Sequence, residues 1–93
     1  MMNPEGNIEL YKLLKNWNPL NFNLEDEENE AFDFDAEIYD SMDALFKHDR
    51  SVEEASLAIQ NIFNFSFEEK IPLDRIRPVV TDAFEIIELY REP

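Results

Sequence analysis

Residues 51–63, SVEEASLAIQNIF, contain the clearest helix signal in the chain. Ser51 followed three positions later by Glu54 is a capping box, in which the serine hydroxyl accepts a hydrogen bond from the backbone N–H of the glutamate. The apolar residues behind it recur at the spacing of one helix face: Val52, Ala55, Ala58, Ile59, Ile62 and Phe63. This stretch predicts an amphipathic helix that begins after Ser51 and has Asn64 as its C-terminal stop.

Two helices are predicted before this stretch. The first covers residues 8–17 and ends at Asn18 and Pro19, because the residue before a proline is disfavoured in helical geometry. The second covers residues 34–48, with Asp33 or Asp35 as its N-cap. The predicted apolar faces are Leu10, Leu13, Leu14 and Trp17 in the first helix, and Ile38, Tyr39, Met42, Leu45 and Phe46 in the second.

A fourth helix is predicted over residues 73–90, after a segment that holds at most one short turn. Its apolar face consists of Leu73, Ile76, Val80, Phe84 and Ile87. Pro78 lies inside this pattern and removes one helical hydrogen bond. We therefore expect either a kink at Pro78 or a single turn that precedes a main helix starting near Arg77.

These segments predict an all-α fold, a compact four-helix bundle-like single domain over residues 1–93 with an acidic loop between its first two helices. Leu, Ile, Val and Phe supply 28 residues, enough apolar surface for one core. The chain has no cysteine, no basic and apolar leader and no apolar run of membrane-spanning length. A cytoplasmic location is therefore expected.

Charge limits the kinds of partner. The formal net charge is −14, from 22 acidic and 8 basic side chains. A field of this sign repels nucleic acid and anionic membranes, and it accelerates encounter with a basic protein. A surface of this kind also confers solubility without any partner, and that alternative stays open.

The acidic residues are concentrated between residues 25 and 43, where no basic residue occurs. Glu37, Asp40 and Asp43 recur on one face of the second predicted helix, with Ser41 and Lys47 beside them. The candidate partner-binding residues are Glu25, Asp26, Glu27, Glu28, Glu30, Asp33, Asp35, Glu37, Asp40 and Asp43. Aromatic residues bracket these acids, and one or two of them exposed among carboxylates would form an anchor for a partner: Phe22, Phe32, Phe34 and Tyr39.

Catalytic and metal sites find little support in the residue inventory. His48 is the only histidine and cysteine is absent, which leaves no zinc ligand set of the usual type. Counted from Asp33, the sixth and twelfth positions of an EF-hand loop hold Ile38 and Ala44 instead of glycine and an acid. We expect no enzyme activity, no cofactor and no metal, with weak divalent-ion binding at residues 25–30 and a carboxylate-based hydrolase left open as alternatives.

Three stretches together resemble the YugE-like family of short helical bacterial proteins with no assigned function: residues 17–20 (WNPL), 34–38 (FDAEI) and 59–73 (IQNIFNFSFEEKIPL). The resemblance spans roughly residues 10–89 and implies a four-helix-type fold. It implies no catalytic residues. The family has a short glycine-bearing link after its tryptophan motif, whereas this chain has a longer acidic segment without glycine there.

Two hypotheses about function follow. The first is an immunity-type inhibitor that neutralises a basic toxin, such as a nuclease, by binding it through the acidic residues. The second is a stand-alone cytosolic adaptor or self-associating structural domain that uses an exposed apolar patch at Phe63, Phe65 and Phe67. Either would be a monomer or a weak dimer.

Overall fold

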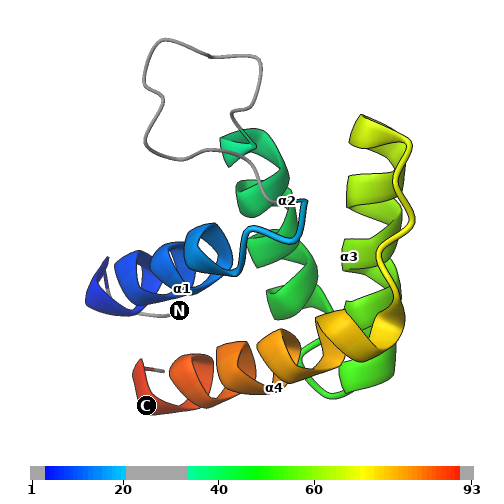
Figure 1. Ribbon diagram of the computed structural model, residues 1–93. Helices are drawn as coiled ribbons and strands as arrows, with labels where there is room; N and C mark the ends of the chain where they lie inside the picture. The colour runs from blue at the N-terminus through cyan, green and yellow to red at the C-terminus, as the bar shows by residue number, and fades with distance from the viewer. Residues whose placement is uncertain (1–3, 21–33, 91–93) are drawn as a thin grey trace, which may run out of the picture.

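The computed structural model describes residues 4–20 and 34–90, which form four helices (Figure 1). They are α1 (Pro4–Trp17), α2 (Asp35–Lys47), α3 (Val52–Phe67) and α4 (Leu73–Tyr90). No strand occurs in these residues, and none of the helices described is long and apolar enough to cross a membrane. The prediction of an all-α, four-helix bundle-like fold is confirmed.

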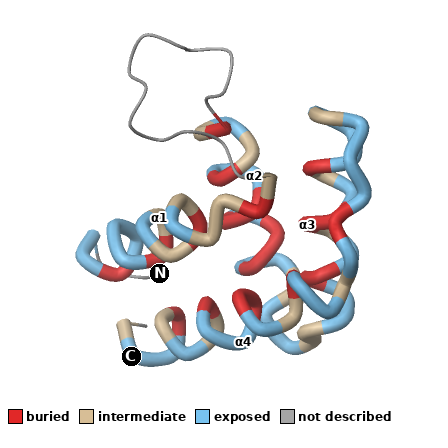
Figure 2. Tube along the Cα trace, in the orientation of Figure 1, coloured by how far each residue is buried: buried red, intermediate tan, exposed pale blue. Residues whose placement is uncertain are grey.

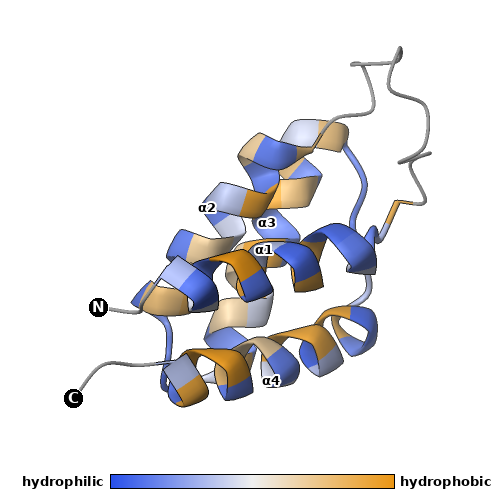
Figure 3. Cartoon of the chain, turned by 90° about the vertical axis from the view of Figure 1, so that its left-hand side faces the viewer, coloured by the Kyte–Doolittle hydropathy of each residue, from blue (hydrophilic) through white to orange (hydrophobic). Residues whose placement is uncertain are grey.

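The helices form two antiparallel pairs. α2 and α3 lie side by side as a helical hairpin, while α1 packs along α4 so that the start of α1 and the end of α4 lie at the same end of the molecule (Figure 1). α1 also packs on α2, and α3 on α4. The buried residues lie on the sides of the helices that face one another (Figure 2). Apolar and polar residues alternate around each helix (Figure 3), as expected for helices with one face in a core.

Phe63 is a buried residue of the core that contacts three other aromatic rings. Its ring contacts Trp17 edge-on at 5.7 Å, Phe34 at 6.2 Å and Phe67 at 6.0 Å between centroids. These contacts join α1, the start of α2 and the end of α3. The buried apolar residues are Leu10, Leu14, Phe34, Ile38, Met42, Ala44, Leu45, Ala55, Ile59, Phe63, Ile71, Ile76, Val79, Val80, Ala83 and Ile87.

α3 begins as predicted but ends later. The Ser51 hydroxyl accepts a hydrogen bond from the Glu54 N–H at 3.1 Å, which confirms the cap. The predicted stop at Asn64 is wrong, because the helix continues to Phe67. It ends where Glu68 takes a left-handed conformation with φ 55°, and the Glu68 N–H then bonds to the Asn64 carbonyl at 2.9 Å.

α1 ends as predicted but begins earlier. Asn18 follows it in a left-handed conformation with φ 40°. Its first residue is Pro4 instead of residue 8, which suits a proline because the N–H it lacks has no helical acceptor there.

α4 is one helix from Leu73 to Tyr90 with Pro78 inside it, so the prediction of a separate turn before Arg77 is wrong. The proline deprives a single carbonyl, that of the exposed Asp74, of its helical partner, and packing of the apolar face on both sides of Pro78 outweighs that loss.

The register of α2 differs from the predicted apolar face in three places. Tyr39 and Phe46 are exposed, and Ser41, placed on the solvent face by the charge pattern, is fully buried. The buried residues of α2 are at positions 38, 41, 42, 44 and 45, which puts the small Ser41 into the stripe and turns Tyr39 outward. Two large aromatic side chains therefore lie on the solvent side of α2.

Candidate protein-binding surface

The predicted acidic residues divide into two groups. Six of them lie outside the described residues: Glu25, Asp26, Glu27, Glu28, Glu30 and Asp33. The other four, Asp35, Glu37, Asp40 and Asp43, all belong to α2. The described part of the surface is thus the outer side of α2 together with its neighbour α1.

Asp35 holds α1 and α2 together. Its Oδ1 accepts a hydrogen bond from the Tyr11 hydroxyl at 2.7 Å and one from the Lys15 ammonium at 2.9 Å. The Lys15 Nζ also lies 5.0 Å from the centroid of the Phe34 ring. The N-cap prediction for Asp35 is wrong, because Phe34 takes that position and Asp35 is the first helical residue with its carboxylate directed sideways to α1. We assign Asp35 a structural role.

Asp40 and Asp43 point to solvent, and Glu37 is half-buried. In the part of the chain that the structure describes, no Lys, Arg or His nitrogen lies within 4.0 Å of the Asp40 or Asp43 carboxylates. Both charges are therefore available to a partner.

Two exposed aromatic residues lie on the same helix as these acids. Tyr39 is 58% exposed and Phe46 is 39% exposed. The Tyr39 ring contacts the Tyr11 ring with centroids 5.8 Å apart. Of the aromatic residues that bracket the acids in sequence, Phe34 is buried and Tyr39 is exposed, while Phe22 and Phe32 lie outside the described residues. An exposed aromatic residue among carboxylates is present, as the hypothesis required.

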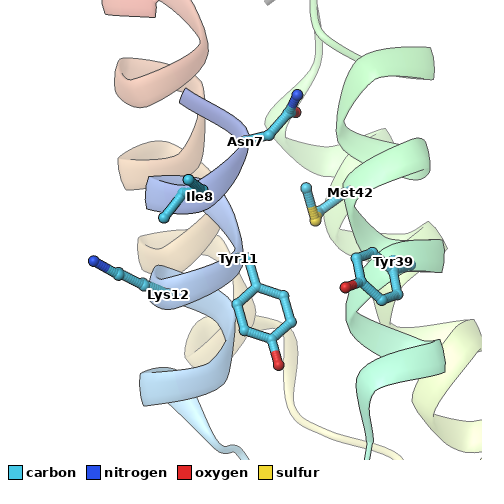
Figure 4. A pocket seen from close by; sticks show the side chains of 6 residues that line it. All are labelled: Asn7, Ile8, Tyr11, Lys12, Tyr39 and Met42. Atoms are coloured by element: carbon cyan, nitrogen blue, oxygen red, sulfur yellow. The ribbon is translucent and has the colours of Figure 1, made fainter. Parts of the chain in front are cut away.

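A groove of about 450 Å³ runs between α1 and α2 beside Tyr39. Figure 4 shows the side chains that line it: Asn7, Ile8, Tyr11 and Lys12 from α1, and Tyr39 and Met42 from α2. The sequence prediction missed this groove. The sequence feature that could have indicated it is Ile8, an apolar residue outside the buried stripe of α1 that is 53% exposed.

A smaller groove of about 330 Å³ lies between α1 and α4, lined by Leu13, Asn16, Trp17, Arg75, Pro78, Val79 and Asp82. Arg75 Nη2 donates a hydrogen bond to the Pro19 carbonyl at 3.1 Å. This contact fixes the turn after α1 on α4.

The apolar patch expected at Phe63, Phe65 and Phe67 is absent, and this expectation is wrong. Phe63 is 1% exposed and Phe67 is half-buried against it, since α3 continues through both residues and turns them inward. Phe65, on the opposite side of the helix, is 90% exposed.

Other charged residues connect helices. Arg77 donates to the Glu53 carboxylate and so joins α4 to the start of α3, and this hydrogen bond raises the pKa of Arg77. His48 Nδ1 lies 3.6 Å from Glu54 at the turn between α2 and α3. Within residues 4–20 and 34–90, no three His, Asp or Glu side chains come together as a metal site.

The model of one protein family matches residues 9–89, and its description is domain of unknown function (DUF1871). No curated protein and no solved structure matches the chain.

Proposed function

The chain belongs to the DUF1871 family of domains of unknown function, and we propose that it is an acidic protein-binding module of the immunity type, which binds a basic toxin or nuclease and so neutralises it. The observation that supports this proposal is the outer side of α2. Asp40 and Asp43 are exposed there beside the exposed Tyr39, with no described base near either carboxylate.

The chemistry of this surface suits a cationic target. Carboxylates can occupy the positions that a nuclease reserves for phosphates, and a net charge of −14 accelerates the encounter. Tyr39 adds apolar area of the kind that slows dissociation. In this proposal the acids outside the described residues, Glu25 to Asp33, also contribute to binding, and the protein acts in the cytoplasm.

A capture experiment tests the proposal. The chain is immobilised and incubated with cell extract at about 0.05 M and 0.5 M NaCl, and proteins retained only at low salt are identified and purified. We expect a basic protein whose affinity falls at least tenfold when Asp40 and Asp43 are both changed to Lys, because two attractive charges become repulsive. If the partner is a nuclease, the chain should stop its cleavage of DNA or RNA.

The matched control is the double reversal of Asp82 and Glu85 on α4, which alters the net charge equally but leaves α2 intact. A purified partner that binds the Asp40 and Asp43 variant as tightly as the original chain contradicts the proposal. So does a nuclease that remains active when fully bound.

One observation supports the alternative of an adaptor or self-associating domain. Phe65 and Leu89 are 90% and 76% exposed, which is unusual for large apolar side chains on a small domain. In that case sedimentation velocity shows a dimer that persists at high salt and is lost in the Phe65→Ala variant. The resemblance to the YugE-like family is compatible with either function.

A further inference from the structure

We propose that the groove between α1 and α2 receives one apolar side chain of a cationic segment of the partner, whose flanking Lys or Arg residues then contact Asp40 and Asp43. This inference rests on the proposed function and adds the chemistry of the segment that is recognised: a bulky apolar residue with basic residues on both sides.

The groove is preformed. Met42 is 9% exposed and belongs to the core, so it forms the floor, with Tyr39 on the α2 side of it and Tyr11 on the α1 side, and with Ile8 farther out on α1 (Figure 4). Tyr11 is held by its hydrogen bond to Asp35 at 2.7 Å and by its contact with the Tyr39 ring. Walls that are fixed before binding lower the entropy that association costs.

Its size and lining suit an apolar side chain. The groove is open to solvent and offers about 450 Å³ between two helices, which is room for one side chain. Ile8, Met42 and the faces of the two tyrosine rings offer apolar contact, and sulfur and aromatic groups of this kind accept an indole or a phenyl ring well.

Charge selects a cationic occupant. Asp43 lies one helical turn after Tyr39, so its exposed carboxylate is on the same side of α2 as that wall of the groove, and the exposed Asp40 is next to Tyr39 in the chain. Lys12, which also lines it, has its ammonium 4.0 Å from the Glu9 carboxylate and is thereby partly offset. A second copy of the chain, with a net charge of −14, and an anionic membrane are both repelled from this surface.

Capped pentapeptides provide the probes: Lys-Lys-Trp-Lys-Lys, the same peptide with Gly in place of Trp, and Glu-Glu-Trp-Glu-Glu. Binding is followed at low salt by methyl NMR of Ile8 and Met42, which reports the groove directly. We expect the Trp peptide to shift both methyl signals and to bind at least about tenfold more tightly than the Gly peptide, since burial of the ring contributes more than 1.4 kcal/mol. The acidic peptide should not bind.

Variants on the groove have matched controls elsewhere. Ile8→Ser and Tyr39→Ala should each reduce the advantage of the Trp peptide over the Gly peptide to less than about threefold. Leu89→Ser and Phe65→Ala remove apolar side chains that are even more exposed, on α4 and α3, and should leave it unchanged. Lys12→Glu should strengthen the Trp peptide severalfold, because a repulsive charge at the groove becomes attractive.

Failure of this inference is distinguishable from failure of the proposed function. Equal binding of the Trp and Gly peptides, weakened in both cases by Asp40→Lys and Asp43→Lys, overturns the groove as an anchor site but leaves acidic docking intact. If neither cationic peptide binds, and the affinity of a purified partner is unchanged by Asp40→Lys and Asp43→Lys, both the groove and the proposed function are overturned. If free indole binds as tightly as the Trp peptide, the groove is a small-ligand site and the cationic segment is overturned. If the methyl shifts depend on protein concentration alone, the occupant is a second copy of the chain.

Discussion

Asp35 and Asp43 show how two aspartates on one helix serve different purposes. Both lie in the acidic stretch of the sequence, and nothing in their spacing separates them. Asp35 accepts hydrogen bonds from Tyr11 and Lys15, whereas Asp43 is exposed with no described base within 4.0 Å. The difference arises because α1 lies against the start of α2 and supplies the two donors.

Isosteric substitutions should separate these roles. Asp35→Asn loses the charge that attracts Lys15 and should lower the free energy of unfolding by about 1 kcal/mol, a value discounted for its partial exposure. Asp43→Asn should change it by less than about 0.5 kcal/mol and should weaken binding of the cationic pentapeptide. Urea unfolding and peptide titration measure the two effects. Equal stabilities of the two variants would contradict the structural role of Asp35.

Ser41 and Ser56 are fully buried, and neither hydroxyl has a hydrogen-bond partner among the described residues. A buried polar group without a partner costs about 1–3 kcal/mol. Ser41→Ala and Ser56→Ala should therefore each raise the free energy of unfolding by about 1 kcal/mol in urea denaturation. Ser66→Ala, an exposed serine of α3, is the control and should gain only a few tenths from helix propensity. A loss of stability in both buried variants would show that the hydroxyls contribute to packing.

At the scale of the helices, the end of α3 carries backbone strain. Glu68 has φ 55° and no glycine is present to relieve the contact between Cβ and the backbone. Glu68→Gly should raise the free energy of unfolding by about 0.5–1 kcal/mol, measured by thermal or urea unfolding.

Glu69→Gly is the matched control, because it removes the same charge at a neighbouring residue without positive φ. It should be neutral or destabilising, since glycine there only enlarges the entropy of the unfolded chain. A gain of stability in both variants would attribute the effect to charge instead of strain.

The sequence predicted what depends on local chemistry. Ser51 marked the start of α3 because a capping hydroxyl acts within one turn, and Asn18 with Pro19 marked the end of α1 for the same reason. Of the two alternatives at Pro78, the separate turn is wrong, because packing across the whole of α4 outweighs one lost hydrogen bond. Tyr39 and Phe46 were placed in the core since an apolar pattern does not reveal which side of α2 its neighbours cover. The groove needed Ile8 and Tyr39 from two helices, and only their packing brings them together.

For the whole molecule, the dominant property is its large excess of negative charge. A net charge of −14 on a small domain opposes compaction, and salt screens this repulsion. Raising NaCl from about 0.01 M to 0.15 M shortens the screening length from about 30 Å to 8 Å. We expect the midpoint of thermal unfolding to rise by about 4 °C or more, which circular dichroism can measure.

A charge-reduced variant provides the comparison. Reversal of Asp82 and Glu85 to Lys lowers the magnitude of the net charge from 14 to 10 and should reduce the dependence of the midpoint on salt. A midpoint of the original chain that is indifferent to salt would mean that the charges are too far apart to destabilise the fold.

The pairing of α1 with α4 also implies an order of assembly. α2, α3 and α4 are joined by short turns, so their contacts form between neighbours in the chain, whereas the Arg75 to Pro19 hydrogen bond spans 56 positions. Closing so long a loop costs entropy that only the finished interface repays, and α1 is expected to dock last. If α1 docks last, the groove between α1 and α2 forms only in the last step of folding, and a partner bound there should slow the departure of α1 from the other three helices.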